Sequence, residues 1–352
     1  MLGRTGQRNL CSSPHRQPCY RGNVQQALLP RAVGTEPPTL SIVVPCFNED
    51  DALGHFWTTI VPFLETLLVR WEIVFVNDGS SDRTLAKLLE MHRADRRAKV
   101  VDLTRNFGKE AAMTAGLDHA RGDMVAVMDV DLQDPPELLG EMVDLWRQGY
   151  DVVVARRVSR FDDTAIKRVS AGQFYRVFNS ISPSKIPADV GDFRLMDKRV
   201  VAALQQLPER VRFMKGLFAW VGFPTATVDY ERPVRQAGTT KFNYWRLWNF
   251  ALDGITSFST LPLRIWSYFG VFVATVSFIY GLIIIGQTLI FGIEVPGYAS
   301  QLTVMLFLGG MQLMGLGIMG EYLGRIYSET KHRPIYLTAA LYGFAPEKDA
   351  QS

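Results

Sequence analysis

Residues 123–137 read DMVAVMDVDLQDPPE, an apolar run followed at once by a group of carboxylates. The run DMVAVM (123–128) is short, apolar and bounded by polar residues, which predicts a buried strand. The carboxylates that follow it are Asp129, Asp131, Asp134 and Glu137. So much negative charge at the end of a buried strand has two possible explanations: the residues begin the next helix, or they hold a cation.

The same pattern continues on both sides of this stretch. Short apolar runs predict further strands, and helical spacing of apolar residues predicts helices between them. The predicted strands are LSIVV (40–44), WEIVFV (71–76), KVVDL (99–103) and DVVVA (151–155), and the predicted helices are 50–69, 84–93 and 109–120. Strands that alternate with helices indicate the α/β class, with a mainly parallel, Rossmann-like sheet and helices on both of its faces.

Three polar clusters follow predicted strands at the point where each strand ends. They read CFNED (46–50), NDGSSD (77–82) and DVDLQD (129–134). Ligands of such sheets bind at the carboxyl ends of the strands. We therefore expect the three clusters to converge on one crevice.

The four carboxylates divide into two pairs. Asp134, two prolines and Glu137 match a capping box, which assigns this pair mainly to starting a helix. Asp129 and Asp131 lie before that helix, and in an extended segment residues i and i+2 project to the same side. Two carboxylates on one side repel each other unless a cation lies between them. Mg²⁺ takes such oxygen ligands together with substrate phosphates, and Gln133 could add an amide oxygen.

The C-terminal third of the chain has a different composition. No charged residue occurs in 265–293 or in 295–320, and each stretch exceeds the roughly 20 apolar residues that a membrane-spanning helix needs. We predict a hairpin at 265–327 with spans at about 265–291 and 300–322. The preceding segment, 241–264, is rich in Trp and Phe, which is typical of interfacial amphipathic helices.

The flanking charges predict how the chain is oriented. Arg264 precedes the first span, and Arg325 and Lys331 follow the second, so the positive-inside rule places both ends in the cytoplasm. The net charge of +3 is interpreted as a matter of topology, because no basic patch with interleaved aromatics indicates nucleic-acid binding. The remaining predicted segments are a disordered N-terminal arm (1–38), a cytoplasmic catalytic domain (39–240) and a basic tail (328–352).

Cysteine usage agrees with a cytoplasmic location. The chain has three cysteines, and an odd number argues against a disulfide framework. Cys11 and Cys19 flank His15 in the N-terminal arm, but their spacing matches no standard zinc pattern. The arm lacks the apolar stretch of a signal peptide.

Six motifs in combination resemble one known family. They read SIVVPCFNE, VNDGSSD, NFGKEAAMTAG, MDVDLQDPPE, GDFRLMDKR and GEYLGRIY. Over 40–337 the chain resembles family 2 glycosyltransferases with a GT-A fold, and most of all the polyisoprenyl-phosphate branch with a membrane hairpin. Within that branch it is similar to bactoprenol glucosyltransferases of the O-antigen modification type, and more distantly to dolichol-phosphate mannose synthase.

The resemblance implies roles for particular residues. It implies that Mg²⁺ or Mn²⁺ is bound by Asp129, Asp131 and Gln133. It implies a UDP-sugar site formed by Pro45, Phe47, Glu49, Asp78, Lys109, Asp129 and Val130. The implied catalytic residues are Asp192, Arg156 and Lys241.

Several of these residues also have plain structural explanations. Asp78 precedes a glycine, as turn residues do, and Glu49 could begin a helix. Lys109 could be a solvated helix residue, and Asp192 could pair with Arg194. The neighbour of Arg156, Arg157, could take its place, and Lys241 could be a juxtamembrane lysine.

The implied reaction moves a hexose, most of all glucose, from UDP to undecaprenyl phosphate with inversion. A bound metal stabilises the charge of the leaving diphosphate. The second pKa of a phosphate monoester is near 6, so the nucleophile needs cations more than a base. Candidate cations are Arg156, Arg194, Arg235 and Lys241. The role of Asp192, as a base or as an orienting group, stays open.

Other functions compete with this one. The same lipid could receive mannose, galactose, GlcNAc or a modified pentose. A processive synthase would carry a Gln-x-x-Arg-Trp signature, which the sequence lacks, and a nucleotidylyltransferase would need a glycine-rich triphosphate loop. A scaffold or flippase component would not need Asp129, Asp131 and Gln133 together. The resemblance also implies a homotetramer in the bacterial inner membrane that crosses it more than once.

Overall fold

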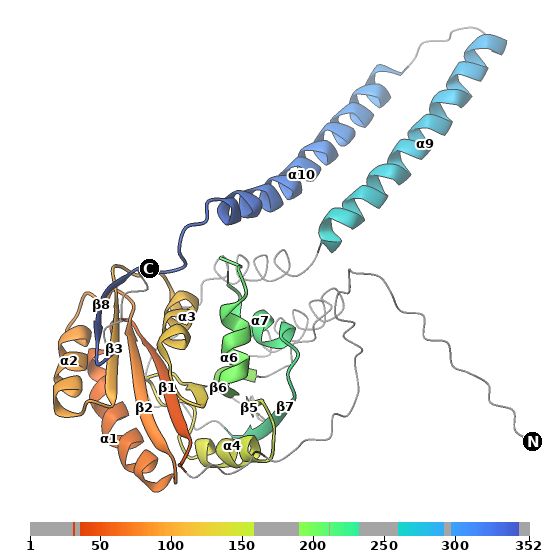
Figure 1. The fold of residues 1–352 in the computed structure, drawn as a ribbon. Helices are drawn as coiled ribbons and strands as arrows, with labels where there is room; N and C mark the ends of the chain where they lie inside the picture. The colour runs from red at the N-terminus through yellow and green to blue at the C-terminus, as the bar shows by residue number, and fades with distance from the viewer. Residues whose placement is uncertain are drawn as a thin grey trace, which may run out of the picture.

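The computed structural model describes residue 31 and residues 36–157, 190–210, 212–231, 260–291 and 297–344. These residues form an α/β domain, from which a long helical hairpin projects (Figure 1). The strands are β1 (Thr39–Cys46), β2 (Arg70–Asn77), β3 (Ala98–Leu103), β4 (Met124–Val127), β5 (Val152–Arg157), β6 (Val190–Asp197), β7 (Thr225–Tyr230) and β8 (Thr338–Tyr342). The helices are α1 (Asp50–Thr66), α2 (Thr84–Ala94), α3 (Lys109–His119), α4 (Leu138–Arg147), α6 (Lys198–Gln205), α7 (Met214–Trp220), α9 (Leu261–Phe291) and α10 (Tyr298–Thr330).

All eight strands belong to one sheet, in the order β7-β5-β6-β4-β1-β2-β3-β8. The pairs β1–β2, β1–β4, β2–β3 and β5–β7 are parallel, whereas β6 and β8 run antiparallel to their neighbours. The central strands are buried almost throughout, as expected for runs of Val and Ile that are covered on both faces. The predicted α/β class with a mainly parallel sheet is confirmed.

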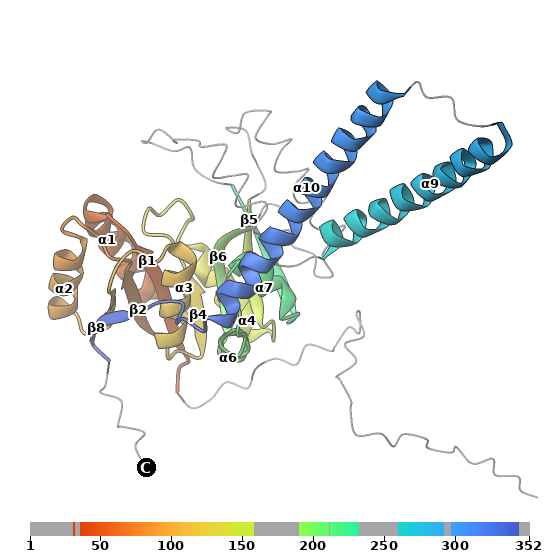
Figure 2. The same ribbon diagram turned by 90° about the horizontal axis from the view of Figure 1, so that it is seen from above.

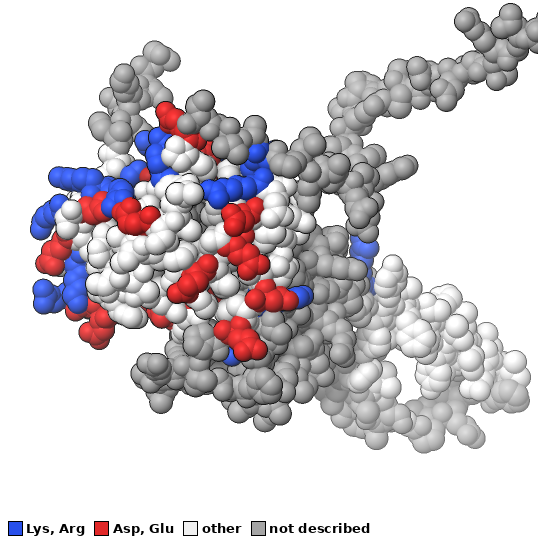
Figure 3. Space-filling view, turned by 90° about the horizontal axis from the view of Figure 1, so that it is seen from below, with Lys and Arg blue, Asp and Glu red and all other residues white. Residues whose placement is uncertain are grey.

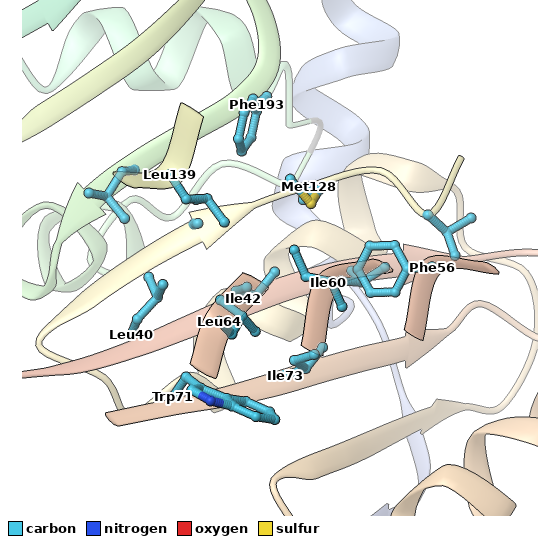
Figure 4. Close-up of a cluster of buried hydrophobic side chains, with 14 of the residues drawn as sticks. Leu40, Ile42, Phe56, Ile60, Leu64, Trp71, Ile73, Met128, Leu139 and Phe193 are labelled. Atoms are coloured by element: carbon cyan, nitrogen blue, oxygen red, sulfur yellow. The ribbon is translucent and has the colours of Figure 1, made fainter. Parts of the chain in front are cut away.

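The core has two parts, one on each face of the sheet. On one face, Phe56, Ile60 and Leu64 of α1 pack on Ile42 and Ile73 of the sheet (Figure 4). On the other face, α3, α6 and α7 pack on the alternate residues of the same strands. Because successive side chains of a strand point to opposite faces, one apolar strand contributes to both clusters.

The predicted capping box at Asp134 is wrong. Helix α4 begins at Leu138, and its N-cap residue Glu137 makes no side-chain capping bond. Instead, the carboxylate of Asp134 accepts a hydrogen bond from the hydroxyl of Tyr230 on β7. The contact partner comes from a strand far along the chain, and local sequence gives no sign of it.

Parts of both predicted terminal segments contribute to the domain. Strand β8, within the predicted basic tail, pairs with β3 at the edge of the sheet. Arg31, within the predicted arm, forms ion pairs of 2.7 Å with Asp151 and 2.6 Å with Asp197. The segment predicted to lie in the membrane interface, 241–264, is outside the described residues except for its last five positions.

The hairpin consists of α9, with 31 residues, and α10, with 33. Among the described helices, one stretch, Leu263–Gln287 in α9, is long and apolar enough to cross a membrane. The two helices pack closely where Gly315 of α10 meets Trp266 of α9. A Cβ added at Gly315 would lie only 2.0 Å from Nε1 of Trp266, so the contact requires glycine. Figure 2 shows the two helices side by side, and in Figure 3 their surface carries almost no colour for charge.

Candidate functional site

A pocket of about 330 Å³ opens at the carboxyl ends of β1, β2 and β4. It brings together the three polar clusters that the sequence separates. The residues that line it are Pro45, Cys46, Phe47, Glu49, Asp78, Asn106, Gly108, Lys109, Ala112, Asp129, Val130 and Asp131. Every residue predicted to contact the UDP-sugar is in this set, so the predicted convergence on one crevice is confirmed.

One wall of the pocket is a loop that Asp78 holds in place. The two carboxylate oxygens of Asp78 accept hydrogen bonds from the backbone N–H of Phe107 at 2.7 Å and of Gly108 at 2.9 Å. Burial raises the pKa of Asp78, and these hydrogen bonds oppose the rise. Asp78 is therefore both a lining residue and the anchor of the loop.

The same loop also requires a glycine at position 79, in the turn that lies against it. Gly79 has a φ of +64°, and a Cβ there would lie 2.3 Å from the carbonyl carbon of Arg105. Any larger residue would push the loop away from the pocket, since the contact is with backbone atoms. The predicted turn at Gly79 is thus also a point of close approach between two loops.

The mouth of the pocket is acidic. Glu49, Asp129 and Asp131 all line it, and Phe47 lies at the rim with 46% of its surface exposed. The pKa of Glu49 is raised, first by burial and then by the negative charges of Asp131 and Asp129. This excess of negative charge is what a cationic ligand would relieve.

Lys109, which lines the pocket, forms ion pairs with Asp129 in the lining and with Asp192 outside it. Its ammonium group is 2.8 Å from Asp129 and 2.7 Å from Asp192. The sheet register brings the two carboxylates near each other: Val127, the last residue of β4, pairs with Arg194 on β6, and Asp129 and Asp192 each lie two residues from that pair. Lys109, the first residue of α3, then lies between the two carboxylates.

Asp192 is held in its ionised form. Burial disfavours the charge, but attraction to Lys109 and Lys215 outweighs it and lowers the pKa of Asp192. Behind it, the guanidinium of Arg194 is buried and bonds to the carbonyl oxygens of Gly191 and Asp192. Asp192 therefore does contact Arg194, as expected, but through the backbone carbonyl of Asp192. The carboxylate of Asp192 faces Lys109 and Lys215 instead.

A carboxyl group with a raised pKa, that of Glu110, lies beside Asp192. Burial, followed by the charge of Asp192, raises the pKa of Glu110 to about 7. Its carboxyl group accepts a hydrogen bond of 3.3 Å from the backbone N–H of Met214, at the start of α7. Glu110 thus ties α3 to α7 next to Asp192.

The donor atoms at the pocket mouth suit a hard divalent cation. Asp129 and Asp131 supply two carboxylates, and such an ion commonly completes its sphere with phosphate and water oxygens. In the described part of the chain, no three His, Cys, Asp or Glu side chains gather closely enough to form a complete metal site. The side-chain amide of Gln133 donates a hydrogen bond to Asp131, so Gln133 orients that carboxylate. Its predicted role as a direct ligand stays a prediction.

Of the predicted catalytic cations, Arg156 is the one that the structure describes away from the pocket. Arg156 forms two hydrogen bonds of 2.7 Å with Asp229 on β7, and it does not line the pocket. Its neighbour Arg157 does not line the pocket either. Lys241 and Arg235 lie outside the described residues.

Sequence reasoning did not single out several residues of the site. Asn106 and Gly108 line the pocket, and Glu110 and Lys215 surround Asp192. The motif NFGKE contains three of them, and its position after a predicted strand could have indicated a loop at the carboxyl edge. Lys215 follows no strand and had no such signal.

Comparisons with known proteins place this geometry in a family. Residues 41–204 match the model of glycosyl transferase family 2, and residues 261–326 match a domain described as the GtrB C-terminal hairpin. A bactoprenol glucosyl transferase of Shigella phage SfV is 52% identical over 298 residues, which is 85% of this chain and 97% of that protein. The chain belongs to glycosyl transferase family 2. The pocket described above is accordingly the candidate active site of a glycosyltransferase.

Other relatives of this family 2 glycosyltransferase have less specific names or lower similarity. An uncharacterized glycosyltransferase of Synechocystis is 52% identical over 304 residues, covering 86% of this chain and 96% of that protein. Among solved structures, a glucosyl-3-phosphoglycerate synthase from Mycobacterium tuberculosis, in complex with Mn²⁺, UDP-glucose and phosphoglyceric acid, is 17% identical. It covers 62% of this chain and 78% of its own, with a TM-score of 0.43.

Proposed function

We propose that this enzyme transfers glucose from UDP-glucose to a polyisoprenyl phosphate, bactoprenol phosphate in bacteria, with inversion at the anomeric carbon. One observation carries the proposal. The bactoprenol glucosyl transferase of Shigella phage SfV matches 85% of this chain, which requires the match to extend over both the catalytic domain and part of the C-terminal hairpin. Transfer of another sugar to the same lipid is the second candidate.

The pocket supports a nucleotide-sugar donor. Phe47 at the rim offers an aromatic face to a base, and Asp78 holds the loop that forms one wall. At the acidic mouth, Asp129 and Asp131 are available to a diphosphate through a bound cation. Carboxylates and phosphates repel each other, so donor binding needs a cation between them.

We propose that Asp129 and Asp131 hold this cation, Mg²⁺ or Mn²⁺. When bound, the metal stabilises the charge that builds on the β-phosphate as the glycosidic bond breaks. Gln133 keeps Asp131 in position through its amide hydrogen bond. Lys109 contributes a fixed positive charge next to Asp129 and links it to Asp192.

Asp192 marks the acceptor side in this proposal. Its lowered pKa keeps it ionised, whereas a phosphate monoester is itself largely deprotonated at neutral pH and needs no strong base. Asp192 is therefore best suited to hold Lys109 in place and to orient the acceptor or the sugar. A single in-line displacement then gives inversion.

The hairpin supports a membrane-bound acceptor. A polyprenyl chain leaves the bilayer at a cost of about 0.8 kcal/mol per CH₂ group, so the enzyme has to reach the phosphate at the headgroup plane. We propose that α9 and α10 both span the bacterial inner membrane and that the catalytic domain is cytoplasmic. We also propose that the enzyme assembles as a homotetramer through the exposed hairpin faces.

The proposal is tested with purified enzyme, Mg²⁺, undecaprenyl phosphate and labelled UDP-glucose. We expect label in the lipid phase, and we expect Asp131→Asn to lose it. Lys198→Met is the matched control, because Lys198 is exposed and pairs with Asp123, which precedes β4 at its opposite end. Label from a different UDP-sugar alone would reject glucose and keep the acceptor, and no transfer from any nucleotide sugar would reject the proposed function.

A further inference from the structure

We propose that Lys215, which no motif singles out, binds the phosphate of the lipid acceptor. This inference rests on the proposed function, since it assigns a residue to the acceptor half of that site. Four observations carry it: the contact of Lys215 with Asp192, the way nearby cations are already held, its place beside the hairpin, and the charge balance around it.

The first observation is the geometry at Asp192. Lys215, in the first turn of α7, places its ammonium group 3.9 Å from Oδ1 of Asp192, while Lys109 contacts Oδ2 at 2.7 Å. At 3.9 Å the Lys215 ammonium is attracted to the carboxylate without donating a hydrogen bond to it. Its side chain is 27% exposed. Lys215 is thus oriented toward the reaction centre and still accessible to a ligand.

The second observation is that three other cations near Asp192 in the described part of the chain are tightly held. Lys109 contacts both Asp129 and Asp192 at short distances. Arg194 is 4% exposed, bonds to two backbone carbonyls and stacks on Phe218 at 3.8 Å. Arg156 forms a two-pronged ion pair with Asp229. Of these cations, Lys215 can turn toward a phosphate with the least loss of existing contacts.

The third observation is the position of α7 beside the hairpin. The backbone N–H of Arg210, four residues before α7, donates to Glu329 in the last turn of α10 at 2.9 Å. The Arg210 guanidinium also donates to the carbonyl of Arg333. Figures 1 and 2 agree that the domain end of α10 lies near α6 and α7. A phosphate attached to a lipid beside the hairpin would approach the domain from this side, where α7 carries Lys215.

The fourth observation is the charge balance. The charges of Asp129 and Asp131 are taken up by the cation proposed there, but Asp192 would still repel a second anion. Lys109 alone cannot offset both Asp192 and an incoming dianion. A second ammonium on the far side of Asp192 changes this. The acceptor phosphate can then lie between Lys215 and Lys109, with Asp192 keeping the two lysines apart.

The decisive experiment compares Lys215→Met with wild-type enzyme. Met keeps most of the side-chain length and removes the charge, Lys215→Arg keeps the charge, and Lys198→Met is the control for loss of an exposed lysine. We expect KM for undecaprenyl phosphate to rise about tenfold in the Met variant, with the KM for UDP-glucose and the affinity for UDP unchanged. Arg should restore most of the acceptor affinity. An unchanged acceptor KM, or an equal rise for the donor, would overturn the assignment.

A binding measurement separates failure of this inference from failure of the proposed function. Geranyl phosphate, a soluble prenyl phosphate, is titrated into the detergent-solubilised enzyme saturated with UDP and Mg²⁺. Weaker binding to Lys215→Met, at an unchanged melting temperature, supports the site even if glucose is the wrong sugar. Equal binding to both proteins rejects it. Inorganic phosphate is titrated in parallel, and equal affinity for both ligands would show that the site does not recognise a lipid.

Discussion

The carboxylates at the two edges of the sheet, where the parallel strands begin and where they end, differ in how far they are paired with basic side chains. At the amino ends lie Asp123, Asp151 and also Asp197, the last residue of the antiparallel strand β6, and all three are paired. Lys198 holds Asp123, and Arg31 and Arg199 together hold Asp151 and Asp197. At the carboxyl ends, Lys109 contacts Asp129 and Asp192, and Lys215 lies near Asp192. Glu49 and Asp131 add two further carboxylates to the same site. Among these residues, acidic and basic side chains are equal in number at the amino ends. At the carboxyl ends the acidic side chains outnumber the basic ones.

The difference separates structural charge from functional charge. A buried carboxylate that has fixed basic partners contributes to the fold, whereas a cluster with excess charge stays costly until a ligand binds. Substitutions of charged residues in the cluster at the carboxyl ends should therefore reduce activity and leave stability largely intact. Mutations at the amino ends should do the reverse. Four experiments test this contrast, from the largest expected effect to the smallest.

The largest effect is expected at the carboxyl ends for Lys109→Met. Removing the ammonium leaves Asp129 and Asp192 facing each other without a cation between them. We expect glucosyl transfer to fall by about 10²–10³, the range typical of losing one preorganised charged or hydrogen-bonding group at a reaction centre. Steady-state transfer assays measure the loss, and a melting curve within a few degrees of wild type shows that the fold is kept. Activity within tenfold of wild type would contradict the bridging role.

At the amino ends, Arg31→Ala should reduce stability and spare catalysis. The side chain contacts Asp151, Asp197 and the ring of Trp146, and its backbone N–H bonds to Arg147. Arg199 remains next to both carboxylates, so we expect a loss of about 2 kcal/mol rather than the 3–5 kcal/mol typical of an unpaired buried charge. Chemical denaturation measures it. Arg31→Lys should lose less, and a fall in transfer by the folded protein would break the contrast.

The loop that Asp78 holds is tested by Gly79→Ala. The new Cβ would collide with backbone atoms of Arg105, and the positive φ adds strain, so we expect a cost of about 1–2 kcal/mol. Because the same loop lines the pocket, UDP affinity should fall as well. Gly54→Ala is the matched control, since nothing lies within 4 Å of its Cβ position on α1. It should be neutral or slightly stabilising. Unchanged UDP binding in Gly79→Ala would show that the loop does not contact the nucleotide.

The smallest effect is a change in pH dependence for Glu110→Gln. The pKa of Glu110 is about 7 in the folded protein and near 4.5 when unfolded, so its contribution to stability is full below pH 4.5 and is lost as pH rises to 7. Gln does not titrate, so the variant should gain stability relative to wild type across that window, by about 1 kcal/mol after solvent screening. Melting temperatures between pH 4.5 and 8 measure this gain. The surrounding charged groups, Asp192, Lys109, Lys215 and Arg194, are the same in both proteins. Parallel curves of melting temperature against pH for the two proteins would contradict the raised pKa of Glu110.

Much of the catalytic domain was predictable from local sequence. The apolar runs and helical spacings gave the first five strands and the helices between them nearly in place, because such patterns reflect burial on one face or two. The clusters after those strands gave the pocket, since parallel strands bring their carboxyl ends to one edge. The capping-box prediction failed because Asp134 has a partner, Tyr230, that is distant in sequence.

The sequence by itself determined the alternation of strands and helices, the acidic strand ends and the apolar hairpin, because each is a property of neighbouring residues. Only the tertiary structure decided that Lys109 lies between Asp129 and Asp192, that Lys215 faces Asp192, and that β8 completes the sheet. These contacts join segments far apart along the chain. They depend on strand register and helix packing, which local patterns do not specify.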